Sequence, residues 1–269
     1  MKRHLIAVDL DGTLLTDNKT ILKRTKSALM KAMEKGHHVV ISTGRPYRAS
    51  KSYYHELGLK TPIVNFNGAY VHHPRNPDWG VYHTPLELDT ARALIKTCEN
   101  YDLANIMVEV KDDVYIRNPE PETLEAFNAG DPKVITGDVN NTLQDNPTCV
   151  LIQPHKQHVV SLIKDLEKHH ADAVQQRSWG EPWNIIEVIR PGINKAVGLR
   201  RVAADLDIPA EHIIAFGDED NDIDMLQYAG QGIAMGNAMD DIKKAADKVT
   251  ATNEEDGIAQ YLENELALV

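Results

Sequence analysis

Asp9 and Asp11 are two carboxylates separated by one residue, at the end of the short apolar run Leu5-Ile-Ala-Val8. Residues i and i+2 of an extended chain point the same way, so both side chains can face one site. Carboxylates this close repel each other, so either a cation lies between them or one holds a proton at a raised pKa. Both states suit phosphoryl chemistry, because a hard cation such as Mg²⁺ screens a phosphate and a carboxylate can attack phosphorus. The alternative is that Asp11-Gly12 forms only a β-turn.

A second group of polar residues follows the apolar run that begins at Val39 and leads into Ser42-Thr-Gly-Arg-Pro46. Thr43 can hydrogen-bond a phosphate oxygen, Gly44 lets backbone N–H groups approach, and Arg45 can pair with a charged substrate. The alternative reading of the same residues is that Thr43 caps the next helix and Gly44 makes the turn.

A third group of polar residues follows the run His212-Ile-Ile-Ala-Phe-Gly217. Asp218 and Asp222 are four positions apart across a predicted strand-to-helix turn, so both can reach one cation. Lys195 begins another predicted helix and can supply positive charge to a phosphate oxygen or to the nucleophile.

The elements that must position these residues follow from hydrophobic periodicity. Four- or five-residue apolar runs predict buried strands, and helical spacing is found at 21–35, 47–58, 195–206 and 223–228. A strand, a helix and a second strand imply a parallel pair with a right-handed crossover. Because open α/β sheets place their ligands at the carboxyl ends of the strands, Asp9, Asp11, Thr43, Asp218 and Asp222 are expected to share one crevice.

The pattern changes between residues 83 and 189. A helix to about residue 101 precedes strands at 104–110 and 113–117, and a helix at 157–170 precedes strands at 173–177 and 184–189, with a further strand at 149–153. Residues 118–147 are rich in Asn, Pro, Asp and Gly and carry no assignable periodicity. Runs of this kind favour an antiparallel α+β layer. We therefore predict an α/β core, Rossmann-like and doubly wound, formed by 1–82 and 190–269, with an inserted α+β domain at 83–189.

Composition limits the class of function. The chain has 269 residues, is 42% hydrophobic and carries a net charge of -11. This charge disfavours nucleic-acid and anionic-membrane partners, which require clustered Lys and Arg. The N-terminal apolar run is too short for a signal peptide, and no segment has the length of a membrane span. Cys98 and Cys149 lack metal-ligand spacing, so we expect free thiols and a cytoplasmic protein.

Other site motifs fit poorly. The acidic stretch from Asp218 has Ile223 and Ala229 where a calcium loop needs Gly and Glu. The glycines of 230–236 are spaced one residue too widely for a dinucleotide fingerprint, and no Walker-type Gly-Lys-Ser/Thr is present. None of the 12 histidines lies in a zinc signature, so we interpret them as solvated or structural.

The chain resembles haloacid dehalogenase (HAD) superfamily phosphatases of the Cof type, which carry a C2B cap. The resemblance covers essentially the whole chain and rests on four ordered motifs with two smaller matches. These are Asp9-Leu-Asp-Gly-Thr-Leu-Leu15, Ser42-Thr-Gly-Arg-Pro46, Asn67-Gly-Ala69, Asn194-Lys195 with Gly217-Asp-Glu-Asp-Asn-Asp-Ile-Asp-Met-Leu226, then Ala234-Met-Gly-Asn-Ala238 and Asn253-Glu-Glu-Asp-Gly257.

The resemblance implies a role for each matching position. Asp9 would be the nucleophile, and Asp11 the general acid and then the general base. Mg²⁺ would be held by Asp9, Asp218 and the backbone carbonyl of Asp11, with Asp222 close by. The phosphoryl group would be held by Thr43, the backbone of Leu10 and Gly44, Lys195 and Asn221. The implied cap would close over the site and select the leaving group. Glu219 stands where many relatives have Gly, which we regard as a tolerated difference in the loop.

The stretch 177–183 in the inserted domain carries Arg177, Trp179 and Trp183. The two tryptophans could stack on a sugar or a ring of the substrate, and Arg45 could touch its distal part. The alternative, which we favour for the tryptophans, is that they pack in the core of that domain.

The sequence therefore predicts a cytoplasmic, Mg²⁺-dependent phosphatase of small phosphorylated metabolites, such as sugar phosphates, nucleotides or flavin-type phosphates. Two alternatives are a phosphomutase of the same superfamily and a non-catalytic metabolite sensor. The mutase would return the phosphoryl group to a sugar, and the sensor would bind without turnover. The paired acids argue against a sensor, because a pure binder does not need two carboxylates beside a metal.

Overall fold

A computed structural model of the chain describes residues 2–180 and 183–268. The chain divides into two compact units. The first contains Met1–Arg45, Ser50–Tyr82 and Asn194–Val269, and the second contains Pro46–Ala49 and His83–Ile193.

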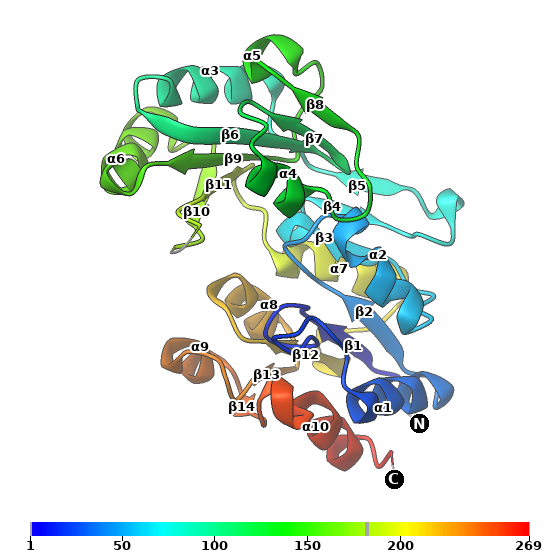
Figure 1. Cartoon of the computed structure of the whole chain (residues 1–269). Helices are drawn as coiled ribbons and strands as arrows, with labels where there is room; N and C mark the ends of the chain where they lie inside the picture. The colour runs from blue at the N-terminus through cyan, green and yellow to red at the C-terminus, as the bar shows by residue number, and fades with distance from the viewer. Residues whose placement is uncertain (1, 181–182, 269) are drawn as a thin grey trace. The chain divides into compact units, whose positions relative to one another are not determined.

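The first unit is built on a five-stranded parallel sheet with the strand order β14-β13-β12-β1-β2 (Figure 1). Its strands are short, and three of them, β1, β2 and β12, are buried almost throughout, as expected for central parallel strands. The strand bounds are β1 (Leu5–Val8), β2 (His38–Ile41), β12 (Ile213–Gly217), β13 (Gln231–Ala234) and β14 (Lys248–Val249).

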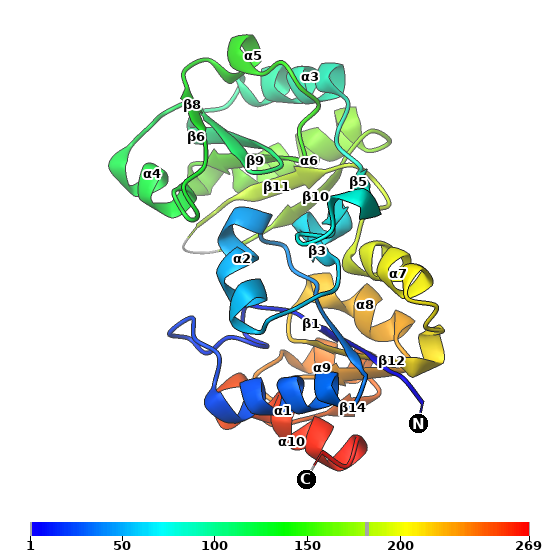
Figure 2. The same cartoon turned by 90° about the vertical axis from the view of Figure 1, so that its right-hand side faces the viewer.

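Helices cover both faces of this sheet. Leu199 of α7, Met225 of α8 and Ile242 of α9 belong to one buried cluster with Leu5 and Ala215. On the other face, the ring of Phe216 in β12 meets Tyr261 of α10 edge-on, and an ion pair joins Arg24 of α1 to Glu263 of α10. These two helices lie side by side (Figure 2). The helix bounds are α1 (Lys23–Glu34), α2 (Tyr47–Glu56), α7 (Lys195–Asp205), α8 (Ile223–Tyr228), α9 (Asp240–Ala245) and α10 (Gly257–Glu265).

A small antiparallel sheet of order β3-β4-β5 continues the first unit next to β2, through a parallel bridge between Ser42 and Val64. The strands are β3 (Ile63–Asn65), β4 (Tyr70–His72) and β5 (Val81–His83), and the turn between the first two is the 3-10 helix η1 (Phe66–Gly68). Further 3-10 helices are η2 (Pro77–Trp79), η4 (Ala210–His212), η5 (Asp220–Asp222) and η6 (Asn253–Glu255).

The second unit is a six-stranded sheet of order β10-β11-β9-β6-β7-β8, with α3, α5 and α6 packed on one face. Ile106, Val108, Val150 and Ile152 alternate along β6 and β9 and pack against the helices, as period-two alternation requires. The strands are β6 (Leu103–Val110), β7 (Asp113–Ile116), β8 (Val134–Thr136), β9 (Cys149–Pro154), β10 (Gln175–Ser178) and β11 (Ile186–Ile189). The helices are α3 (Leu88–Cys98), α4 (Pro121–Phe127), α5 (Val139–Thr142) and α6 (Val159–His170), with η3 (Lys156–His158) before the last.

The predicted fold class is confirmed, with a parallel core sheet and a second layer of helices on a largely antiparallel sheet. One difference lies in 118–147, where β8 joins β7 in parallel. The reason is that α4 lies between these strands in the chain, so the connection is a crossover instead of a hairpin.

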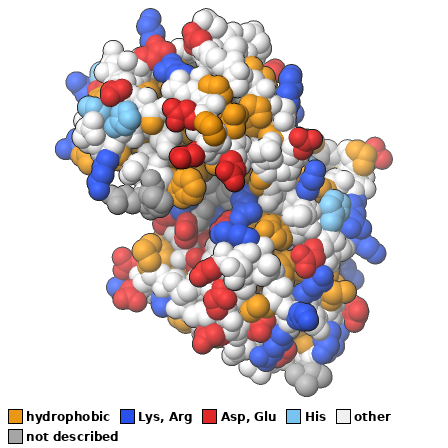
Figure 3. Space-filling model, viewed as in Figure 1, with side chains coloured by type: hydrophobic (Ala, Val, Ile, Leu, Met, Phe, Trp, Pro, Cys, Tyr) orange, Lys and Arg blue, Asp and Glu red, His pale blue; other side chains and the backbone are white. Residues whose placement is uncertain are grey.

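Surface charge and cysteine state agree with the composition. In the face drawn in Figure 3, Lys and Arg side chains are interspersed with Asp and Glu. Cys98 and Cys149 are free and buried. Among the described residues, no helix has both the length and the apolar character that a membrane crossing requires.

His72 of β4 is expected to make the first unit sensitive to acid. Burial lowers the pKa of His72 to about 4 from its ordinary 6.5. The folded state therefore binds this proton less readily than the unfolded chain, so stability is present above pH 6.5 and is lost as the pH falls toward 4. Allowing for partial exposure, unfolding free energy should fall by about 1 kcal/mol between pH 6.5 and 5 because of this ring. Urea unfolding of His72→Gln should show a smaller pH dependence than wild type. The control His55→Gln, at an exposed position, should keep the pH dependence of wild type.

Candidate active site

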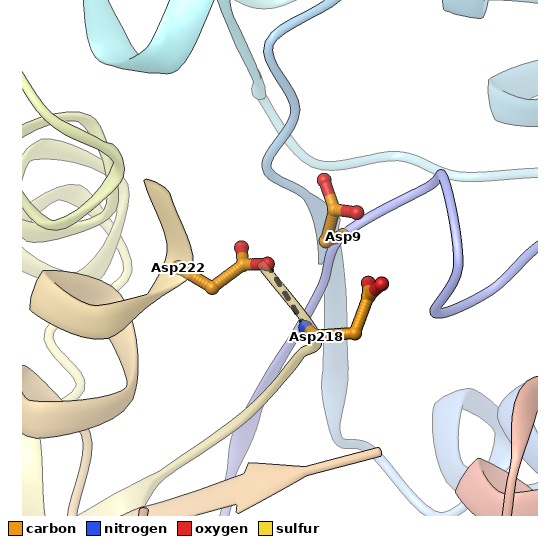
Figure 4. A group of neighbouring side chains, drawn as sticks. All are labelled: Asp9, Asp218 and Asp222. Atoms are coloured by element: carbon orange, nitrogen blue, oxygen red, sulfur yellow. Dashed lines mark hydrogen bonds between the residues drawn. The ribbon is translucent and has the colours of Figure 1, made fainter. Parts of the chain in front are cut away.

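Three carboxylates come together at one edge of the parallel sheet. Asp9 follows β1 and Asp218 follows β12, and these strands are hydrogen-bonded neighbours in the same direction. Asp222 ends η5, one turn after β12. Carboxylate oxygens of all three lie within 4.8 Å of one another, and their side chains converge in Figure 4. The strand-end position predicted from the sequence is thus where the structure places them.

Lys195 lies inside this carboxylate cluster. Its ammonium donates to Oδ1 of Asp9 at 2.6 Å and to Oδ1 of Asp222 at 2.7 Å, and the side chain is buried. Lys195 is held there because it is the first residue of α7, whose N-cap Asn194 accepts from the backbone N–H of Val197 at 3.0 Å. One buried cation thus faces three carboxylates, which leaves the cluster with excess negative charge.

Burial and the neighbouring carboxylates both raise the pKa values of Asp9 and Asp218. Burial raises the pKa of Asp9 well above its usual range, with Lys195 opposing the shift and Asp222 and Asp218 adding to it. Burial also raises the pKa of Asp218 to about 7, against the hydrogen bond from Thr13. The pKa of Lys195 is raised, since Asp222 and Asp9 outweigh the effect of burial. The site therefore stabilises added positive charge.

The carboxylate oxygens of the cluster differ in the hydrogen bonds that they accept. Both oxygens of Asp222 are used, by Lys195 and by the backbone N–H groups of Asp218 and Glu219 at 3.0 and 3.1 Å. Asp218 accepts from the Thr13 hydroxyl through Oδ1 at 2.6 Å, whereas no hydrogen bond within the described residues reaches its Oδ2 or that of Asp9. An all-oxygen donor set with excess charge and two open oxygens fits a hard divalent cation.

Gly12 leaves room for this arrangement. Its φ is +74°, and a Cβ there would lie 2.1 Å from Oδ2 of Asp218. Any other residue would both strain the backbone and displace that carboxylate.

Asp11 lies beside the cluster but is held by cations. Arg45 donates to both of its oxygens at 2.6 Å, and Lys19 donates to Oδ1 at 2.7 Å. These partners outweigh burial and lower the pKa of Asp11. Tyr53 contacts both residues that donate to Asp11. The centre of its ring lies 5.7 Å from the Arg45 guanidinium carbon, and its hydroxyl donates to the backbone carbonyl of Lys19. Lys19 and Tyr53 were missed in the sequence, since nothing in their local pattern points to Asp11.

Apart from Lys195 of α7, the predicted phosphate-binding residues lie on the loops that follow β1, β2 and β12. Leu10 and Thr43 are buried, and the Thr43 hydroxyl accepts from the backbone N–H of Arg45 at 3.1 Å. Asn221 lies in η5 and donates to Oδ1 of Asn67 at 3.0 Å. A Cβ on Gly44 would come within 3.2 Å of that same oxygen. Asn67 is therefore a site residue that sequence reasoning left without a role, although its motif was noted.

The remaining predicted residues lie in the second unit. Trp179 and Trp183 are 40% and 53% exposed, so the favoured interpretation that they pack in a core is wrong. The reason is that Trp179 and Trp183 lie outside the strands, between β10 and β11. The Trp179 indole N–H donates to the buried carboxylate of Glu187 at 3.2 Å, and Arg177 lies opposite Glu187 in the register of β10 and β11. Residues 181–182 of this stretch lie outside the described residues.

Comparison with known proteins gives consistent matches. A family model described as haloacid dehalogenase-like hydrolase matches residues 6–262. The chain is 47% identical to the 5-amino-6-(5-phospho-D-ribitylamino)uracil phosphatase YitU of Bacillus subtilis, over 99% of both chains. It is 30% identical to the pyridoxal phosphate phosphatase YbhA of Escherichia coli, over 99% of this chain and 100% of that one. A haloacid dehalogenase-like hydrolase structure from Bacteroides thetaiotaomicron superposes with a TM-score of 0.86 at 26% identity, covering 98% and 99% of the two chains.

Proposed function

The chain belongs to the haloacid dehalogenase-like hydrolase family and is a phosphatase of small phosphorylated metabolites, and from this premise we propose that it is Mg²⁺-dependent and works through an aspartyl phosphate on Asp9. The observation that carries the mechanism is the cluster of Asp9, Asp218 and Asp222 around a single buried lysine. The sequence prediction of a phosphoric monoester hydrolase is confirmed by the family.

In the first step an oxygen of Asp9 attacks phosphorus. The bond between phosphorus and the ester oxygen breaks, and the leaving oxygen takes a proton from Asp11. Lys195 favours the carboxylate form of Asp9, because it opposes the rise in the pKa that burial causes, and its 2.6 Å hydrogen bond to Oδ1 orients the side chain. We propose that this support lets Asp9 act as the nucleophile.

In the second step water attacks phosphorus, the Asp9–phosphorus bond breaks, and Asp11 accepts the proton of the water. The resting structure favours this base role, because Arg45 and Lys19 keep Asp11 ionised. For the acid role of the first step, the Arg45 contact has to be exchanged for the substrate. We propose that the phosphate dianion draws Arg45 away from Asp11 and that Thr43, Gly44, Leu10, Lys195 and Asn221 hold the phosphoryl oxygens.

A divalent cation would be held by Asp9, Asp218 and the backbone carbonyl of Asp11, with Asp222 positioning the loop that carries Asp218. When bound, it would neutralise charge on the phosphoryl group. Carboxylate and carbonyl oxygens favour Mg²⁺ over softer metals.

The substrate is proposed to be a phosphate ester of a ring-bearing alcohol or a polyol, and that alcohol is the leaving group. The support is the 47% identity to a phosphatase whose substrate joins a uracil ring to a phosphorylated ribityl chain. We propose that the domain at 83–189 serves as the cap and that Arg177, Trp179 and Trp183 contact the organic part of the substrate, with Arg45 at the phosphate end. Cytoplasmic localisation is proposed on the free cysteines.

The test is phosphate release from 5-amino-6-(5-phospho-D-ribitylamino)uracil, pyridoxal 5′-phosphate, ribose 5-phosphate and a generic aryl phosphate. Each is assayed with Mg²⁺, with Ca²⁺ and with chelator, because Ca²⁺ binds the same oxygens with a looser geometry. Release that requires Mg²⁺ supports the proposal. Isomerised sugar phosphate without free phosphate would instead identify a mutase, and ligand-induced stabilisation without turnover a sensor.

Trp179 offers a separate prediction about the leaving group. Its indole is fixed by Glu187, so it presents a preformed face for stacking, which is worth about 1 kcal/mol or more. Trp179→Ala should raise KM roughly tenfold for the ring-bearing substrates while ribose 5-phosphate is little affected. Val160→Ala, at an exposed apolar position of α6, is the matched control. Equal losses on all substrates would mean that Trp179 acts through folding alone.

A further inference from the structure

The turn between β3 and β4 has an unusual backbone. Phe66, Asn67 and Gly68 have φ values of +50°, +52° and +97° in succession. Two consecutive non-glycine residues in the left-handed region carry backbone strain. The turn is buried, and its neighbours must therefore hold it in place. Glycine at position 67 would adopt this conformation without strain, so the presence of Asn calls for a role of its side chain.

Asn67 connects two of the loops that carry the predicted phosphate-binding residues. Its backbone N–H donates to the carbonyl of Thr43 at 3.1 Å, and its Oδ1 accepts from Nδ2 of Asn221 at 3.0 Å. The same Oδ1 lies 3.2 Å from where a Cβ on Gly44 would be. Within residues 2–180 and 183–268, Oδ1 of Asn221 is buried without a hydrogen-bond partner, so the hydrogen bond to Asn67 orients this amide.

Gly68 connects the turn to a third element. A Cβ at this position would lie 2.3 Å from the carbonyl oxygen of Asn194 and 3.2 Å from the backbone nitrogen of Gly198. The turn therefore packs directly on the first turn of α7, which carries Lys195. Only glycine permits this approach, and it fixes where Asn67 stands relative to the helix.

We propose that Asn67 is a positioning residue for phosphate recognition, acting through Asn221 and the Thr43–Gly44 loop. The strained turn fixes the position of the Asn67 side chain, which in turn orients the Asn221 amide. The Thr43–Gly44 loop and the loop that carries Asn221 then present their donors to the same phosphoryl group. The proposal rests on the proposed function only in requiring that a phosphate group binds at this site.

Asn67→Gly separates this role from folding. The substitution removes the amide but relieves the strain of the positive φ, so the lost hydrogen bond and the relieved strain act on stability in opposite directions. We expect a melting temperature close to wild type, a Ki for inorganic phosphate about tenfold higher, and a similar or larger loss of kcat/KM. Asp207→Gly is the matched control, since Asp207 is exposed in the first unit with φ +52°. It should change neither Ki nor kcat/KM.

A double-mutant cycle decides whether Asn67 acts through Asn221. Asn221→Ala alone should raise the phosphate Ki, and Asn67→Gly added to it should raise it by less than twofold more, because the shared interaction is already lost. Multiplicative effects, or an Asn67→Gly enzyme with wild-type phosphate Ki, would overturn the proposal. A wild-type protein that neither releases nor binds phosphate would instead overturn the proposed function, so the two failures are distinguishable.

Discussion

Replacing Asp9 by Asn is expected to lower kcat on the order of 10⁴-fold or more while the fold is retained. The amide cannot attack phosphorus, and the residues that bind the phosphoryl group cannot replace a covalent step. The measurement is phosphate release under saturating Mg²⁺ and substrate, with inorganic phosphate inhibition as a check that the binding site is intact. A variant that keeps a tenth of the wild-type kcat would exclude Asp9 as the nucleophile.

The same variant is expected to be more stable than wild type when chelator is present. Asp9 is buried beside Asp218 and Asp222, so its neutral isostere relieves repulsion that Lys195 does not fully compensate. The expected gain is about 1 kcal/mol in unfolding free energy, measured with urea at pH 7.5. Added Mg²⁺ should then stabilise wild type more than Asp9→Asn, because the variant has lost one charged ligand. A variant less stable than wild type under chelator would contradict the charge argument.

The second large effect is expected from Lys195→Met. Methionine fills a similar volume but leaves Asp9 and Asp222 buried and facing each other without a cation. Removing one partner of a buried ion pair typically costs about 3–5 kcal/mol, and this lysine serves two carboxylates. We expect the unfolding midpoint in urea to fall accordingly and phosphate release to be lost.

A double variant distinguishes loss of charge balance from loss of packing at Lys195. Lys195→Met with Asp222→Asn should recover part of the stability but none of the activity, since the surplus charge is removed while the nucleophile stays unsupported. Lys244→Met is the control, because Lys244 lies in an exposed pair with Asp241 that contributes little. No recovery in the double variant would show that methionine fails for steric reasons.

The core fold and the strand-end positions of Asp9 and Asp218 follow from hydrophobic patterning. Buried parallel strands must be short apolar runs, and Leu5–Val8 and Ile213–Gly217 are such runs, each followed directly by an acid. Local patterning therefore sufficed to put Asp9 and Asp218 at strand carboxyl ends, and the alternation of strands and helices made those ends neighbours. The inserted segment was recognisable because its order of elements changes.

The contacts between the loops at these strand ends depend on the tertiary structure. Arg45 donates hydrogen bonds to Asp11, which is 34 residues away in the sequence, and Asn221 donates to Asn67, which is 154 residues away. The exposure of Trp179 and the parallel pairing of β8 with β7 also depend on how strands meet. Hydrophobic periodicity indicates which face of a helix or strand is buried. It does not indicate which polar group, distant in the sequence, a given side chain will contact. Only the folded chain therefore shows which charges pair, that the backbone at Asn67 is strained, and which carboxylate oxygens are open to a cation.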